Sequence, residues 1–373
     1  MFSMNGFRKM LATAMSEMAK DIMPNDEHPK DDWSKDECQK EATFTKNDGI
    51  LNERRTQSTV DVNRINVDSS SLDVKVSVAD VSDIEVAIKG NAIKVPAIEF
   101  TTEVVEREFC VKTRIKSGIV IGLLYLEVLV PRESRFRRIS ITSSTGDIEI
   151  SRKILVDELN VNTSSGDVSL EKLRDLSTIN IKTSTGDVEV TDYVEAHCLK
   201  IETASGEVEV SNDISADEIE ISTSTGDIEL SDTVYAKTVS IDTCSGEVDI
   251  SKLTASEKVF VETKTGDVEV ANTKADAFRI QTYSGEVDID AEFVKADIDT
   301  STGDVTVSTT AKQDIELNVN SNSGDVSIEL YNIKTIMQTI RTKTGDAYCN
   351  GSGDGEHTAD IHVTTTTGDI EIS

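Results

Sequence analysis

One short motif recurs along the chain at a nearly constant spacing, and this spacing restricts the possible folds more than any other feature. The stretch TSTGDVEV (183–190) has near copies at 223–230 and 263–270. A fixed period of about 20 residues is typical of stacked structural repeats, in which each copy supports the next. The motif glycines are Gly146, Gly166, Gly186, Gly206, Gly226, Gly246, Gly266, Gly285, Gly303, Gly324, Gly345 and Gly368.

Within each unit, apolar and polar residues alternate as they do along a β-strand. Every unit carries Ile or Val five residues before its glycine, and only Ala347 interrupts Ile or Val two residues after it. The alternation predicts that Ile201 points into the core and Lys200 points outward. We expect the glycine to form a corner with positive φ. The threonines from Thr163 to Thr263 should line this corner, with hydroxyls bonded to the backbone or to one another.

Short strands with corners and no helical period predict an all-β fold, a parallel β-solenoid (β-helix) of about twelve ~20-residue coils. Ile and Val suit its interior because branched side chains pack well on a pleated surface. A propeller is the main alternative. It is less economical, because one blade needs about 40 residues and four strands, twice the length of one unit.

Four regions are predicted. Residues 1–23 form an amphipathic helix, which docks on its own domain or on a second copy, with a membrane-surface helix as the alternative. Residues 24–57 are a polar linker without a period. Residues 58–140 are a degenerate β cap with Leu72 in place of the motif glycine. Residues 141–373 are the solenoid repeat domain.

The charge of the chain is strongly negative, with 38 Lys and Arg against 69 Asp and Glu, a formal net charge of −31. Binding to nucleic acid is not expected, because binding phosphates requires a basic surface.

The first residues lack the apolar core of a secretion signal, and the apolar run at 118–130 is too short to span a bilayer. We therefore expect a soluble cytoplasmic protein with little membrane contact. A cell-surface or non-classically secreted protein is the alternative.

Catalysis is not expected. A polysaccharide-modifying β-helix enzyme, the remote alternative, needs acids clustered with a basic residue and aromatic platforms for sugar rings. Aromatic residues make up 4% of the chain and the four histidines are dispersed. Phosphate loops, metal-spaced Cys and His sets and nucleophile motifs are missing from the sequence, so we predict no catalytic residues and no cofactor. Five scattered cysteines (Cys38, Cys110, Cys198, Cys244, Cys349) indicate free thiols rather than a disulfide framework.

Two repeat positions form columns of acids, and we interpret them as a solvated face. The alternative is a ladder of carboxylates that takes up Ca²⁺ or another hard cation. Its candidate residues follow the glycines: Asp147, Asp167, Asp187, Glu207, Asp227, Glu247 and Asp267. A parallel column comprises Glu149, Glu189, Glu209, Glu229, Asp249 and Glu269.

A basic cluster of Arg132, Arg135, Arg137 and Arg138 is interpreted as a solvated turn, with a docking patch for an acidic partner as the alternative.

Units of the form x-T-S-[ST]-G-D-[VI]-x-[VI], preceded by LEVLVP (126–131), resemble the bacterial DUF4097 family of adhesin or β-strand-repeat proteins. The resemblance covers about 60–373. It implies a β-solenoid without catalytic residues, and it implies adhesin-like binding as one role.

We therefore predict a non-enzymatic, acidic β-solenoid that acts as a structural scaffold or protein-interaction module for an unidentified protein partner. Surface adhesin-like binding of a glycan or protein ligand is the alternative. The sequence ends with its last repeated strand, which predicts a terminal coil with an unpaired edge. Pairing of two such edges around a two-fold axis predicts a tail-to-tail homodimer through residues 368–373.

Overall fold

The computed structural model describes residues 50–373 except 95–96, 118–120 and 351–352. The predicted helix at 1–23 and the predicted linker as far as residue 49 lie outside the described residues. The chain divides into two units, Met1–Lys40 and Glu41–Ser373, and the second contains all the structure described below. Its described residues form a 31-stranded sheet and no helix.

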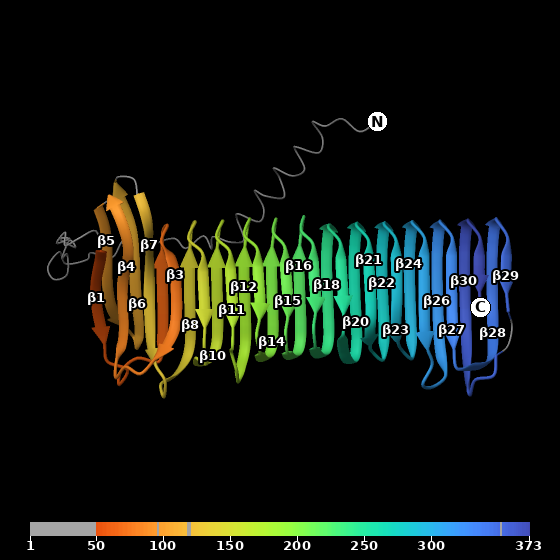
Figure 1. Cartoon of the computed structure of the whole chain (residues 1–373), viewed down its shortest axis with the longest axis horizontal. Coiled ribbons are helices and arrows are strands. Elements are labelled where there is room, and N and C mark those ends of the chain that lie inside the picture. The colour runs from red at the N-terminus through yellow and green to blue at the C-terminus, as the bar shows by residue number, and fades with distance from the viewer. Residues whose placement is uncertain (1–49, 95–96, 118–120, 351–352) are drawn as a thin grey trace. The chain divides into compact units, whose positions relative to one another are not determined.

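The repeats form a parallel β-solenoid in which each coil contributes one long and one short strand (Figure 1). The long strands are β8 (Arg135–Ser143), β10 (Leu155–Thr163), β12 (Leu176–Thr183), β14 (Val194–Thr203), β16 (Ile214–Thr223), β18 (Val234–Ser245), β20 (Leu253–Thr265), β22 (Ala277–Ser284), β24 (Lys295–Thr302), β26 (Ile315–Ser323), β28 (Ile333–Thr344) and β30 (His357–Thr367). The short strands are β9 (Ile148–Ser151), β11 (Val168–Glu171), β13 (Val188–Thr191), β15 (Val208–Ser211), β17 (Ile228–Ser231), β19 (Val248–Ser251), β21 (Val268–Lys274), β23 (Val287–Glu292), β25 (Val305–Thr310), β27 (Val326–Tyr331), β29 (Ala347–Cys349) and β31 (Ile370–Ile372). These 24 strands, two per coil, give the twelve predicted coils.

Equivalent residues of neighbouring coils pair with each other and form columns along the solenoid. Ile181 pairs with Ile201 on the long strands, and Val188 pairs with Val208 on the short strands. The side chain of Ile201 is fully buried, whereas the Lys200 ammonium lies outside, 2.7 Å from Glu220. The predicted alternation is therefore confirmed, and stacked Ile and Val side chains fill the interior, where branched residues pack well.

The motif glycine is required chiefly because the backbone of the neighbouring coil passes very close to it. A Cβ on Gly186 would lie 1.9 Å from the carbonyl oxygen of Gly166, and a Cβ on Gly226 would lie 1.9 Å from that of Gly206. No side chain fits at such a distance. The expectation that positive φ selects every motif glycine is wrong, because the motif glycines with positive φ are only Gly266, Gly303, Gly324, Gly345 and Gly368.

The second corner of many coils follows the short strand. Residues other than glycine adopt positive φ there, in the left-handed region of backbone conformation. Asp192 and Tyr193 have φ of 57° and 70°, and Asn212 and Asp213 have φ of 65° and 63°. Asn and Asp tolerate this region better than most residues.

At the N-terminal end, the order of stacking differs from the order of the sequence. The strands β2 (Arg64–Ser69), β3 (Asp73–Ala79), β6 (Glu108–Ser117) and β7 (Ile121–Pro131) form two more coils. The coil of β2 and β3 lies between β6–β7 and β8–β9. Leu72 occupies the predicted glycine position, and its carbonyl oxygen lies against Gly146.

Three further strands close this end: β1 (Ile50–Gln57), β4 (Ile84–Lys94) and β5 (Ala97–Val105). They pair antiparallel, β5 with β6 and β4 with both β7 and β1. The predicted cap at 58–140 thus contains true coils of the same stack, and its boundary with the repeats falls inside β8. Residues 50–57, predicted as the end of the linker, form β1.

At the C-terminal end, the last coil of the sequence is not the last coil of the stack (Figure 1). The strand β30 lies between β26 and β28, and β31 lies between β27 and β29. Glu371 pairs with Ser327 on one side and Tyr348 on the other. Residues 368–373 therefore do not offer the free edge on which the predicted tail-to-tail homodimer rests. The outermost coil is that of β28 and β29.

Candidate functional site

The acids that follow the motif glycines stack in an exposed column, as predicted, and their aspartates bond the backbone of the next coil. The Oδ1 atom of Asp167 accepts the N–H of Asp187 at 3.0 Å, and Oδ1 of Asp227 accepts the N–H of Glu247 at 2.8 Å. The same bond recurs from Asp73 to Asp369. In the described coils, the column's glutamates accept no such bond. The shorter aspartate side chain therefore has a structural role at this corner.

This geometry gives the aspartates of the column a structural role of their own. All seven candidate residues, Asp147, Asp167, Asp187, Glu207, Asp227, Glu247 and Asp267, are exposed and lie one per coil. Within the part of the chain that the structure describes, no three Asp, Glu, His or Cys side chains are grouped as they would be around a metal ion. The carboxylates are instead spread along the solenoid, and the five aspartates among them each accept a backbone N–H through Oδ1.

The second acidic column forms an uninterrupted row on the short strands β13 to β23, where each acid pairs in register with the next. Repulsion within the row affects its protonation: burial, followed by the charges of Glu209 and other acids, raises the pKa of Glu189. Burial and the charges of Glu269 and Glu229 likewise raise the pKa of Asp249. Among the described residues, no Lys or Arg forms an ion pair with this row. We name it the acidic row: Glu189, Glu209, Glu229, Asp249, Glu269 and Asp288.

The arginine cluster near β8 is largely paired within the chain. The Nε of Arg132 lies 3.0 Å from Asp80, Nη2 of Arg135 lies 2.6 Å from Asp157, and Arg138 contacts Glu158. These contacts support the solvated-turn interpretation and leave fewer charges for an acidic partner.

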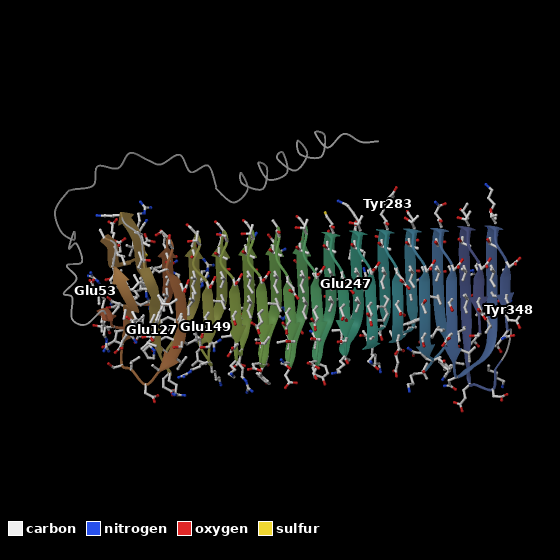
Figure 2. The ribbon with its side chains drawn as sticks, turned by 45° about the horizontal axis from the view of Figure 1, so that its top comes forward. Glu53, Glu127, Glu149, Glu247, Tyr283 and Tyr348 are labelled. Carbon is white, nitrogen blue, oxygen red and sulfur yellow. The ribbon has the colours of Figure 1, made fainter. Side chains whose placement is uncertain are left out.

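A shallow groove of about 430 Å³ crosses the long strands β20, β22, β24 and β26. Tyr283 lines it with 68% of its surface exposed, at the upper border of the solenoid in Figure 2. Sequence reasoning missed this groove. The available signal was the residue two before the motif glycine, which is Ser, Ala or Cys in the six coils of Gly146–Gly246 and then changes to Lys264 and Tyr283.

The described cysteines Cys110, Cys198, Cys244 and Cys349 are free and half-buried. Burial raises the pKa of the Cys110, Cys198 and Cys349 thiols, which disfavours the reactive thiolate.

The described residues include no helix with the length and apolarity needed to cross a bilayer.

Comparison with solved structures gives likenesses below 15% identity. A proposed adhesin from Parabacteroides distasonis is 13% identical over 86% of this chain and 96% of its own, with a TM-score of 0.32. A proposed adhesin from Parabacteroides merdae is 11% identical over 87% of this chain and 96% of its own, also with a TM-score of 0.32. A proposed lipid-binding protein from Parabacteroides distasonis is 14% identical over 87% of this chain and 97% of its own, with a TM-score of 0.23.

TM-scores this low support no conclusion about function, and no curated protein matches the chain. The family model "Toastrack DUF4097" matches residues 62–251 and 192–373, which together cover the coils from β2 to β31. The chain therefore belongs to the DUF4097 (Toastrack) family.

Proposed function

We propose that this chain is a non-enzymatic scaffold that binds a protein partner through that partner's basic surface. The acidic row is the observation that carries this proposal. Its six carboxylates lie on adjoining strands, which are spaced about 4.8 Å apart, and no neighbouring base neutralises them in the described structure. A rigid solenoid holds such a row in place. The backbone that carries the acids is therefore already ordered before a partner binds, which lowers the entropy cost of binding.

Electrostatics favour a cationic partner over an anionic or apolar one. Directly neighbouring like charges destabilise a sheet, and the raised pKa values of Glu189 and Asp249 reflect burial first and this repulsion second. Lys or Arg side chains of a partner would relieve it, and long-range attraction would accelerate association. The described inward columns consist mainly of Ile, Val, Leu, Ala and Thr, so the chemistry available to a partner lies on the outside.

A defined polycation, decalysine, tests the row with the full-length protein. One variant neutralises four of its six carboxylates with Glu189→Gln, Glu209→Gln, Glu229→Gln and Asp249→Asn. Its matched control removes the same charge from exposed acids elsewhere, with Glu195→Gln, Asp213→Asn, Glu218→Gln and Glu257→Gln. We expect salt-dependent binding that the row variant weakens by about tenfold and the control much less. Equal weakening by the two variants would show that only total charge matters and would refute a specific row.

Adhesin-like binding of a glycan or protein ligand is the second candidate, and the groove beside Tyr283 favours it. The two candidates differ in the expected location of the protein, because the scaffold is proposed as cytoplasmic and the adhesin as a surface protein. Fractionation of cells with an antibody against the solenoid separates them. Protein found only in the cytoplasmic fraction supports the scaffold, and protein accessible on intact cells supports the adhesin.

A further inference from the structure

In a solenoid of near-identical coils, a local departure from the repeat marks a surface with its own purpose. The outward position two residues before the glycine is small in the coils of Gly146–Gly246, and at the groove it becomes Lys264, Tyr283, Ser301 and Asn322 in turn. The motif spacing also shortens here, from Gly266 to Gly285 and then to Gly303. Beneath these coils, Phe278 and Phe293 pack edge to face in the core, with ring centroids 6.2 Å apart.

The Tyr283 ring is available for a ligand. Three other exposed tyrosines have partners: Tyr193 lies under the Arg174 guanidinium at 3.6 Å, and the hydroxyls of Tyr331 and Tyr348 donate to Glu329 and Asn350, each at 2.9 Å. Within the described residues, no side chain stacks on the Tyr283 ring or bonds its hydroxyl. An exposed ring of this kind offers an apolar face and a polar tip to whatever enters the groove.

Planar polar side chains stand beside the ring. Gln281 pairs in register with Asp299, and Asp299 pairs with Asn320. The Asn320 amide donates to Oδ1 of Asp299 at 2.9 Å, which fixes the orientation of both groups. An amide offers a donor and an acceptor, and a carboxylate offers two acceptor oxygens. The groove therefore combines one aromatic platform with an adjacent set of hydrogen-bonding groups.

We propose that the groove around Tyr283 binds a carbohydrate. One face of a sugar ring is lined by C–H groups and stacks on the apolar face of the tyrosine. The hydroxyls at the edge of the sugar bond Gln281, Asp299 and Asn320. The open, shallow shape of the groove suits a segment within a longer glycan. This proposal deepens the second candidate function and does not depend on the acidic row.

The test begins with the full-length protein on an array of neutral, N-acetylated and acidic oligosaccharides. The best tetrasaccharide is then titrated into protein with isotope-labelled tyrosine, and ring signals are assigned with Tyr283→Phe. We expect a saturable shift of the Tyr283 ring signals. Tyr283→Ala should weaken binding by roughly tenfold or more, in line with loss of an aromatic contact and its buried area. Tyr283→Phe should retain most of the affinity.

The matched control is Tyr235→Ala, because Tyr235 is 53% exposed and lies outside the groove. It should change binding by less than about twofold. Absence of binding on the whole array, or equal weakening by Tyr235→Ala and Tyr283→Ala, would overturn the proposal. Decalysine binding by Tyr283→Ala should be unchanged, so failure of the groove and failure of the acidic row give different results.

Discussion

The corners at the two halves of the solenoid look alike in sequence but are hydrogen-bonded differently. In the early coils, the N–H of Gly186 donates to the Thr183 hydroxyl of its own coil at 3.1 Å, and Gly166 and Thr163 do the same. In the later coils, the N–H of Gly246 donates instead to the carbonyl oxygen of Thr265, in the next coil, at 3.2 Å. One corner is closed within its coil, and the other belongs to the ladder between coils.

This difference bears on whether the hydroxyls of the threonine column have hydrogen-bond partners. The predicted hydroxyl-to-backbone bonds are confirmed at Thr163 and Thr183. They are wrong at Thr203, Thr223, Thr243 and Thr263, where the described structure gives the buried hydroxyls no partner. The long strand ends at Thr223 in β16 but extends to Ser245 in β18. At Gly246 and Gly266 the continuing ladder therefore takes over the donor that the hydroxyl would otherwise bind, whereas at Gly206 and Gly226 the described structure shows neither bond.

The largest expected effect concerns the core that both halves share. Ile221→Lys places a charge in the fully enclosed interior and should lower the free energy of unfolding by several kcal/mol. Ser222→Lys, one residue away and exposed, places the same charge between Glu202 and Asp242 and should cost almost nothing. Denaturant unfolding of both variants checks this. Similar losses would contradict the inward and outward alternation.

The motif glycine should be equally indispensable in both halves. Gly186→Ala and Gly266→Ala each place a Cβ 1.9 Å from the carbonyl oxygen of the preceding motif glycine. We expect each to cost about 3 kcal/mol, because packed backbone must move apart. Ser224→Ala, on the outer surface, is the control for unfolding measurements. A mild effect at either glycine would show that its corner can relax.

The threonine should distinguish the halves. Thr183→Val removes the acceptor of the Gly186 N–H and should destabilise the protein by about 1–2 kcal/mol. Thr243→Val removes a buried hydroxyl that has no partner among the described residues, so it should be neutral or stabilising. Chemical unfolding of the two variants provides the comparison. A cost at Thr243 equal to that at Thr183 would abolish the distinction between the corners.

The sequence predicted the part of the fold that is repeated in every unit. The positions around Gly186 fix strand alternation, corner and coil length, because the same local requirements recur in each copy. The stacking order was not predictable, because Ile370 and Ile372 fit between any two coils. A partial signal lies in the outermost coil, where Gln338 replaces the usual apolar residue. Charges near it, Lys334 and Lys343, are typical of a protected edge strand.

For the candidate site, the sequence located the acidic columns but not their purpose. The Oδ1 atom of Asp227 accepts the N–H of Glu247, in the next coil, at 2.8 Å. A sequence pattern does not contain this distance between coils. The carbohydrate groove depends equally on the stacking of four coils. Its one visible signal was the break in the repeat at Tyr283.

A smaller effect separates the aspartates of the first acidic column from its glutamates. Asp227→Ala leaves the Glu247 N–H without its acceptor and should cost about 1 kcal/mol. Glu207→Ala removes the same charge from the neighbouring coil, but this carboxylate accepts no such bond in the described structure. Thermal unfolding at fixed salt compares them. Equal effects would mean that charge, rather than the hydrogen bond, accounts for the column.

The smallest effect is a change in pH dependence. Asp249 has a raised pKa in the folded protein, so its contribution to stability is fully present below the unfolded pKa and is lost as pH rises through the folded value. Asp249→Asn should therefore gain a few tenths of a kcal/mol over the parent at pH 7, and this gain should vanish only at a pH well below the ordinary Asp pKa of 3.8. A gain that is the same at both pH values would exclude repulsion as its cause.

Amide hydrogen exchange at the motif glycines tests the two corner types most directly. In Thr183→Val, the Gly186 amide should exchange about tenfold faster, because loss of a 1–2 kcal/mol bond favours local opening. In Thr243→Val, exchange at Gly246 should stay unchanged, because its acceptor is the Thr265 carbonyl. Faster exchange at both glycines, or at neither, would contradict the account of one motif serving two kinds of corner.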